Sequence, residues 1–394
     1  MSIQETSRKQ LKRRLIAKFR LERTLLFPAL IWEKLSRAIE SDPLKVYFRY
    51  KNVNLDLHPW FKRYYTTPPV KYCNLRSAKL FHWITAPSVI NKTPFVVEPN
   101  DHPLSAVASL SPVPVEPAQV IDSMRRAVEL VYHDPSCKKI VVESTGQWEL
   151  FKRYCPEVLH KCEIIRIGTI PKPIESIDFS HTVTSITFLC LASDFDKKAG
   201  DLLLDAWFEF PHRHKHRLIL ACPFVPEAYR QRAQNGNVTF VLKAPLSKRE
   251  KDQLYRNSDV AIGPLHVDGG SNLWEAMEYG LPIITMRCQR SKDQVMNDNG
   301  FVAEVPFYFY DEGYGIEWPT WSEFFRLLKE AKKRGDFDIT KKDFIKAFTF
   351  FNDNPEKISE MGKRSYELAA NEYSLANRNI QLKRVYQDIH DGKL

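Results

Sequence analysis

Residues 259–285 read DVAIGPLHVDGGSNLWEAMEYGLPIIT, and this stretch predicts a strand, a glycine-containing loop, a short helix and a second strand. Residues 260–262 and 281–285 are apolar runs with frequent β-branched residues, as in buried strands. Between them, Ser271 or Asn272 can cap a helix that a glycine ends. Strands joined by such a helix pair in parallel, and ligands of these sheets bind beyond the carboxyl ends of the strands.

The loop of this stretch has the features of an anion site. Gly269 and Gly270 permit close approach of the backbone, and the N–H groups at the start of a helix favour phosphate. Glu275 lies in the first helical turn and faces the same edge. Its spacing from Asn272 also fits a capping box, in which the glutamate would only close the helix end. The pattern leaves both interpretations of Glu275 open.

Strands and helices alternate throughout the second half of the chain. The strands are expected at residues 184–191, 217–222, 238–242, 260–262 and 282–286. The helices between them are expected at residues 200–208, 227–233, 248–258 and 272–279. Such alternation with short loops predicts an α/β fold with a parallel, doubly wound sheet.

The first half is less regular and contains few glycines. Strands are expected at residues 46–50, 80–84, 95–97, 139–142 and 163–167, and helices at 7–38 and 118–132. The first glycine of the chain is Gly146, which excludes the glycine loops of dinucleotide and P-loop folds from the first third. The stiff segment PKPI at residues 171–174 marks the expected domain boundary. We therefore expect domains at 1–172 and 173–372, with a C-terminal helix at 373–394 packing on the first.

Charge is distributed unevenly between the two halves. Residues 1–175 carry a formal charge of +11, whereas residues 176–394 carry −1. The basic amphipathic helix expected at 7–38 allows contact with an anionic membrane surface or with nucleic acid, although such a segment is more often a solvated helix that packs one face on its own domain. No base-reading motif is visible, so we expect no nucleic-acid partner.

Cysteine usage and hydropathy favour a cytoplasmic protein. The seven cysteines are scattered and odd in number, without the spacing of a disulfide framework or a zinc site. No apolar run approaches the roughly 18 residues of a membrane span, and the basic start lacks the apolar core of a signal peptide.

The segment GGSNLWEAMEYGLPIIT resembles the donor site of family-four, GT-B-type retaining glycosyltransferases, in which EGFG precedes EAMAxGxPV. The resemblance implies two Rossmann-like domains facing each other across a cleft, and it places Glu275 on the nucleotide ribose. The first glutamate of the family falls on Val267, so Asp268 is the nearby carboxylate expected to contact the donor sugar. The short, glycine-poor first domain also looks like members encoded by large algal DNA viruses, which would act in the host cytoplasm.

Three further segments resemble the family. DFDKKAGD at residues 194–201 implies that Lys197 and Lys198 contact the donor diphosphate. The loop and helix start at Gly269, Gly270, Ser271 and Asn272 would complete that contact. Leu246 lies in the turn that contacts the nucleobase through its backbone, and His102 lies where the family places a histidine near the donor sugar. His102 and Asp268 are therefore the expected catalytic residues.

The resemblance implies transfer of a hexose from a nucleotide-diphosphate sugar, with GDP-mannose favoured, to a hydroxyl of a glycan or glycoprotein acceptor. We expect retention of configuration, no metal and no cofactor besides the donor. The alternatives are a basic nucleic-acid-binding protein, a sugar-binding relative without activity, and a metal-dependent GT-A enzyme that uses Asp194 and Asp196. The tripeptide Asp-Phe-Asp recurs at residues 336–338 without a strand before it, so it arises easily by chance.

Three histidines alternate with basic residues in the run PHRHKHR at residues 211–217. Metal binding needs convergent neutral imidazoles, and the neighbouring arginines and lysine oppose a cation. We therefore expect an exposed basic turn there.

Overall fold

The computed structural model describes residues 80–84, 93–99, 132–180, 183–243, 245–266, 271–296, 298–308 and 321–394. The helix expected at 7–38, the strand expected at 46–50 and nearly all of the helix expected at 118–132 lie outside these residues. His102, Val267, Asp268, Gly269 and Gly270 also lie outside them. Within the described ranges, no helix combines the length and the apolar character needed to cross a membrane.

The second half of the chain forms a parallel six-stranded sheet. Its strands are β5 (Thr187–Leu191), β6 (Arg217–Ala221), β7 (Val238–Val241), β8 (Val260–Gly263), β9 (Ile283–Met286) and β10 (Gly300–Ala303). Their order is β10-β9-β8-β5-β6-β7, so the chain builds outward from β5 in one direction and then from β8 in the other. The topological switch point therefore lies between β5 and β8, where ligands of doubly wound sheets bind.

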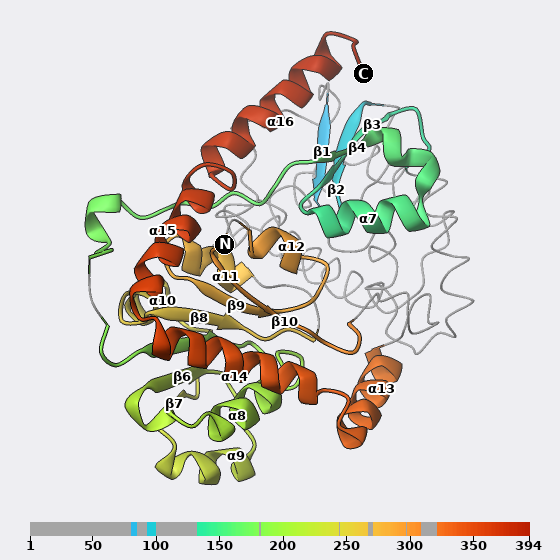
Figure 1. The fold of residues 1–394 in the computed structure, drawn as a ribbon. Helices are drawn as coiled ribbons and strands as arrows, with labels where there is room; N and C mark the ends of the chain where they lie inside the picture. Colours follow the sequence, from blue (N-terminus) through green and yellow to red (C-terminus); the bar gives the residue numbers. More distant parts are fainter. Residues whose placement is uncertain are drawn as a thin grey trace, which may run out of the picture.

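Helices cover both faces of this sheet (Figure 1). They are α8 (Gly200–Glu209), α9 (Glu227–Arg232), α10 (Lys248–Arg256), α11 (Ser271–Met277), α12 (Ser291–Gln294), α13 (Trp321–Arg334), α14 (Asp338–Asp353) and α15 (Glu356–Ala370). Side chains alternate along each strand: Phe188 and Cys190 pack with α8 and α14, whereas Leu189 packs with α10 and α11. The strands are apolar throughout because both of their faces are buried.

The first half forms a parallel four-stranded sheet in the order β1-β2-β3-β4. Its strands are β1 (Phe81–Ile84), β2 (Phe95–Glu98), β3 (Cys137–Val142) and β4 (Cys162–Ile164), and α7 (Thr145–Tyr154) links the last two. Short 3-10 helices at Pro156–Lys161, Ile174–Ser176, Arg213–Lys215 and Ala233–Asn235 join other elements. The six cysteines in the described part of the chain are free thiols.

The last helix, α16 (Leu375–His390), leaves the second sheet and crosses to the first one (Figure 1). Leu382, Val385 and Ile389 of α16 pack on Val96 and Val141 of the four-stranded sheet. These apolar residues recur at helical spacing and form one face of the helix. The expectation of a C-terminal helix that crosses back is confirmed.

A buried ion pair fixes this crossing helix. The Arg378 side chain is only 2% exposed and donates to the backbone oxygens of Ile165 (3.1 Å) and Arg166 (3.0 Å). It also donates to Glu98 Oε1 at 2.5 Å, and His82 Nε2 lies 3.3 Å from Glu98 Oε2. Burial raises the pKa of Glu98, but the Arg378 charge and the His82 contact outweigh burial and hold that pKa below 4.5.

The Glu98→Gln variant tests this ion pair. Removing the carboxylate leaves the buried Arg378 charge uncompensated, which should cost about 3–5 kcal/mol of unfolding free energy. Because the folded pKa is depressed, the wild type should hold this stabilisation above pH 4.5 and lose it as the pH falls through the folded pKa. Thermal unfolding between pH 3 and pH 7 measures both effects. The variant should lack the part of the stability that the wild type loses on acidification. Equal stability of the two proteins would contradict a stabilising ion pair between Glu98 and Arg378.

The two domains also meet where α7 begins. The backbone of Gly146 approaches Gln289 so closely that an added Cβ would lie 2.0 Å from the Gln289 carbonyl oxygen. Thr145 donates from its backbone N–H (3.0 Å) and its hydroxyl (2.9 Å) to the carboxylate of Asp293 in the second domain. The first glycine of the chain therefore permits contact between the domains.

We predict that Gly146→Ala separates the domains at this contact, because the new methyl group overlaps the Gln289 backbone. Overpacking of this kind costs about 1–3 kcal/mol. The radius of gyration from small-angle X-ray scattering should rise, and the melting temperature should fall. Gly236→Ala is the matched control, since its Cβ would meet the Phe208 ring at 3.0 Å and the Ala233 backbone oxygen at 3.6 Å, both inside the second domain. Unchanged scattering and stability in Gly146→Ala would contradict the prediction.

Candidate functional site

The loops after β5 and β8 are tied together at the switch point of the six-stranded sheet. Asn272 Nδ2 donates to the backbone oxygen of Leu191, the last residue of β5, at 2.8 Å. The backbone N–H of His266 donates to the backbone oxygen of Lys197 at 3.1 Å. These bonds bring the loop that carries Lys197 and Lys198, here called the lysine loop, and the start of α11 to one edge of the sheet. The sequence predicts a ligand site at this edge.

The lysine loop is a tight turn. Asp194 Oδ1 accepts from the backbone N–H of Lys197 at 2.9 Å, so this aspartate shapes the turn. Ala199 adopts the left-handed conformation with φ 45°, which glycine adopts more easily. Within the described part of the chain, no cluster of three or more His, Cys, Asp or Glu side chains could hold a metal ion. The expectation that the reaction needs no metal remains a prediction.

Glu275 occupies a buried position beside α10. Its side chain is nearly inaccessible, and Lys251 Nζ lies 3.1 Å from both carboxylate oxygens. The hydroxyl of Tyr255 donates to Glu275 Oε2 at 3.0 Å and also lies 2.9 Å from the Asn272 backbone oxygen. Lys251 and Tyr255 therefore orient the carboxylate, and the sequence identified neither of them.

The capping box with Asn272, one of the two interpretations of Glu275, does not form. The helix α11 begins at Ser271, so Asn272 is its second residue and cannot be the cap. The Asn272 side chain instead donates to the backbone oxygen of Leu191, a contact across 81 residues that local sequence does not reveal. Of the two caps that the sequence allows, Asn272 is therefore wrong, and Ser271 is the first residue of α11.

The remaining sequence-predicted positions have different outcomes. Leu246 is partly buried and lies just before α10, whose cap Ser247 forms a capping box with Glu250. The predicted catalytic residues His102 and Asp268 lie outside the described residues.

The expected exposed basic turn is wrong at one position. His216 is buried, and both ring nitrogens have partners there: Nδ1 accepts from the Ile186 N–H at 3.1 Å, and Nε2 lies 2.9 Å from Asn352 Oδ1. Burial lowers the pKa of His216, which fits a neutral structural imidazole.

His266 is a further buried residue beside the lysine loop. Its ring packs edge-to-face against Phe337 with centroids 5.3 Å apart. Burial, assisted by the charge of Lys332, lowers the pKa of His266 well below 6.5. This histidine is therefore neutral and leaves the positive charge at this edge to the lysines.

The first domain contacts this region through a buried ion pair. Glu143, just after β3, lies 3.1 Å from Arg290, and both side chains are buried. The guanidinium of Arg290 lies 5.7 Å from the ring centroid of Trp274 in α11. The pair connects the end of the first sheet to the helix that carries Glu275. No local signal in the sequence marks these residues.

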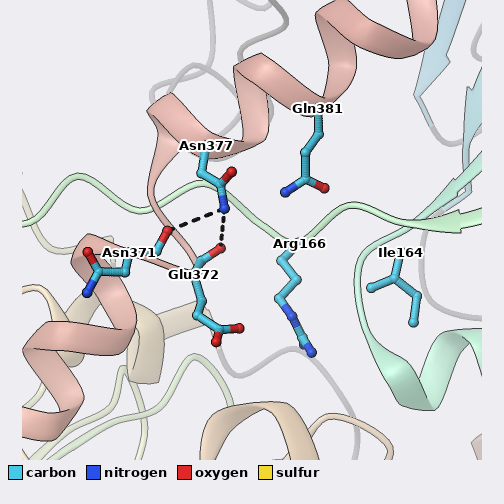
Figure 2. Close-up of a pocket in the computed structure, with 6 residues that line it drawn as sticks. All are labelled: Ile164, Arg166, Asn371, Glu372, Asn377 and Gln381. Atoms are coloured by element: carbon cyan, nitrogen blue, oxygen red, sulfur yellow. Dashed lines mark hydrogen bonds between the residues drawn. The ribbon is translucent and has the colours of Figure 1, made fainter.

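A separate cavity of about 340 Å³ lies where the chain passes between the domains (Figure 2). Its lining consists of Ile164, Arg166, Asn371, Glu372, Asn377 and Gln381. Asn377 Nδ2 lies 3.4 Å from the backbone oxygens of both Asn371 and Glu372, which shapes the corner before α16. Lys197, Lys198 and Glu275 do not line it, so it is distinct from the switch-point site.

Comparisons with known proteins bear on the second domain and on the whole fold. Residues 185–306 match the family model described as "Glycosyl transferases group 1". No curated protein matches the chain. WaaG, a glycosyltransferase involved in lipopolysaccharide biosynthesis, is similar over 86% of this chain and 81% of its own, with 15% identity and a TM-score of 0.53.

Alr3699/HepE from Anabaena is also similar in structure. Its complex with UDP matches 75% of this chain and 73% of its own, with 13% identity and a TM-score of 0.51. Its complex with UDP and glucose matches 75% and 72%, with 13% identity and a TM-score of 0.50. The fold and the matched domain together define the class: this protein is a glycosyltransferase with the GT-B fold. Both of these expectations from the sequence are confirmed.

We predict that Glu275→Gln weakens nucleotide binding without unfolding the protein. If the carboxylate accepts bonds from ribose hydroxyls, its charge contributes about 1.5–3 kcal/mol. Affinity for a nucleoside diphosphate should therefore fall roughly ten- to a hundredfold by calorimetry. A 2′,3′-dideoxynucleotide should bind the wild type and the variant equally weakly.

Lys251→Met is the matched control, since it removes the ion pair and keeps the carboxylate. Its nucleotide affinity should not fall. An equal loss in both variants would show that Glu275 acts only through its pair with Lys251, and would remove it from the ribose site.

Proposed function

We propose that this protein transfers a hexose from a nucleotide-diphosphate sugar to a hydroxyl of a glycan or other acceptor, with retention of configuration. The observation that carries the proposal is that hydrogen bonds tie the loops after β5 and β8 together at the switch point, so that the loop with Lys197 and the helix with Asn272 and Glu275 share one sheet edge. A carboxylate suits ribose hydroxyls, and lysines suit a diphosphate. The match of residues 185–306 to group 1 glycosyltransferases supports the same assignment.

The proposed chemistry follows from these charges. The bond between the sugar and the diphosphate breaks through an oxocarbenium-like state, while Lys197 and Lys198 stabilise the negative charge that develops on the leaving diphosphate. Backbone N–H groups at Gly269, Gly270 and Ser271 complete the contact with that diphosphate. The departing phosphate takes the proton of the acceptor hydroxyl. Asp268 and His102 contact the donor sugar, and Leu246 contacts the base.

Two nucleotide sugars are candidates for the donor. The sequence resemblance favours GDP-mannose, whereas the similar HepE structures contain UDP and glucose. The basic first domain holds the acceptor, and the basic segment at residues 7–38, where the sequence predicts a helix, contributes peripheral contact with an anionic membrane surface.

Turnover of a donor panel tests the proposal. The full chain is incubated with GDP-mannose, UDP-glucose and other nucleotide hexoses plus glycan acceptors, and the released nucleoside diphosphate is measured. One donor should be consumed, and the rate should survive a chelator. Loss of activity with the chelator and rescue by manganese would contradict the metal-independent chemistry.

The lysines provide the matched variants for this assay. Replacing both Lys197 and Lys198 by alanine should lower kcat/KM by at least about tenfold, because charged hydrogen bonds to the diphosphate are lost. Lys363→Ala, at an exposed position of α15, should behave as the wild type. No turnover of any donor by the wild type would overturn the proposed function.

A further inference from the structure

Two exposed apolar side chains follow neighbouring strands of the six-stranded sheet. Phe224 is 65% exposed and comes three residues after β6, and Leu242 is 48% exposed and directly follows β7. The two strands pair in parallel through Ala221 and Val241. Both side chains therefore lie at the carboxyl edge of the sheet, which is the edge that carries the lysine loop.

The loop that holds Phe224 has a defined shape. It reads Pro223-Phe-Val-Pro226, and each proline restricts its own φ. The Cys222 Sγ lies 3.0 Å from the Phe224 backbone oxygen, while the side chain of Val225 is buried. With the next residue anchored inward, the phenyl ring remains at the surface.

This loop is adjacent to the lysine loop. The backbone N–H of Ala192, which follows β5, donates to the oxygen of Ala221 at the end of β6 at 2.8 Å. Burial is the main cause that raises the pKa of the Cys222 thiol, and the negative charges of Asp194 and Asp196 raise it further. This effect fits a position of Cys222 close to the lysine loop. Neighbouring strands are about 5 Å apart, so the exposed pair lies one to two strand spacings from the lysine loop. A ribose ring can bridge that separation.

A single exposed phenylalanine on a protein surface is ordinary. This ring differs because a second exposed apolar residue follows the neighbouring strand at the same sheet edge, which also carries the site proposed for a diphosphate. A base has an apolar face and lies on the far side of the ribose from the diphosphate. We propose that Phe224 is the stacking platform for the nucleobase of the donor, with Leu242 flanking it. This inference rests on the proposed function and adds the residue that holds the base.

Stacking of a base on an aromatic side chain is sequence-tolerant, because every base has a π-face. Loss of one such contact weakens binding by about 5- to 150-fold. The larger purine ring covers more of the platform than a pyrimidine does. GDP should therefore lose more affinity than UDP when the ring is removed.

Calorimetry with the full chain tests the platform. Phe224→Ala should weaken GDP and UDP binding within that range, and Phe224→Tyr should restore it because its ring can stack. Inorganic pyrophosphate, which has no base, should bind Phe224→Ala as it binds the wild type. Ile380→Ala is the matched control, since Ile380 is 67% exposed and lies on α16 away from this edge. It should leave all three affinities unchanged.

Three results would overturn the inference. Unchanged GDP and UDP affinity in Phe224→Ala would show that the ring does not touch the base. An equal loss for pyrophosphate would show general disruption of the site. Absence of nucleoside diphosphate binding to the wild type would contradict the proposed function and remove the platform with it.

Discussion

Thr169 joins the two segments of chain that pass between the domains, and the arrangement of the molecule depends on that junction. Its backbone N–H donates to the Tyr373 oxygen at 2.5 Å, and its carbonyl accepts from the Leu375 N–H at 2.9 Å. Its hydroxyl lies 2.7 and 2.8 Å from the backbone oxygens of Ala369 and Tyr373. Thr169 is fully buried, so a lost bond would leave a polar group unsatisfied at a cost of about 1–3 kcal/mol. The junction therefore holds the two crossings side by side.

The position of α16 follows from this junction. Its first residue, Leu375, donates its backbone N–H to Thr169 and is held there. Arg378, one turn later, bonds to Glu98 inside the first domain. A further contact between the domains, Glu143 with Arg290, is a buried ion pair. Such pairs add little net stability over apolar packing, but leaving one partner alone is costly. The pair therefore contributes little to the free energy of unfolding, but it favours the one placement of the domains in which both charges have a partner.

Local pattern predicted the elements, whereas long-range contacts decided their details. The strands at 260–262 and 282–286 were predictable because two buried faces require continuous apolar residues. The strand β10 was missed because it lies at the sheet edge, and Gly300, Phe301 and Val302 are only half-buried there. The capping box with Asn272 failed because α11 begins at Ser271, which places Asn272 inside the helix, where its side chain donates to the Leu191 carbonyl 81 residues away. Thr169 could not be singled out either, since its partner Tyr373 is 204 residues distant.

The surroundings of Glu275 show how one carboxylate can be structural and functional at once. Lys251 lies close to both carboxylate oxygens, and Tyr255 donates to one of them. The ribose hydroxyls would compete for these acceptor positions, so Lys251 must release the carboxylate when ribose binds. The Lys251 side chain is 36% exposed, so its ammonium group can move into water, whereas the Glu275 side chain is only 5% exposed and needs replacement donors. Tyr255 remains bonded and keeps the carboxylate in place, and the ribose hydroxyls would supply those donors.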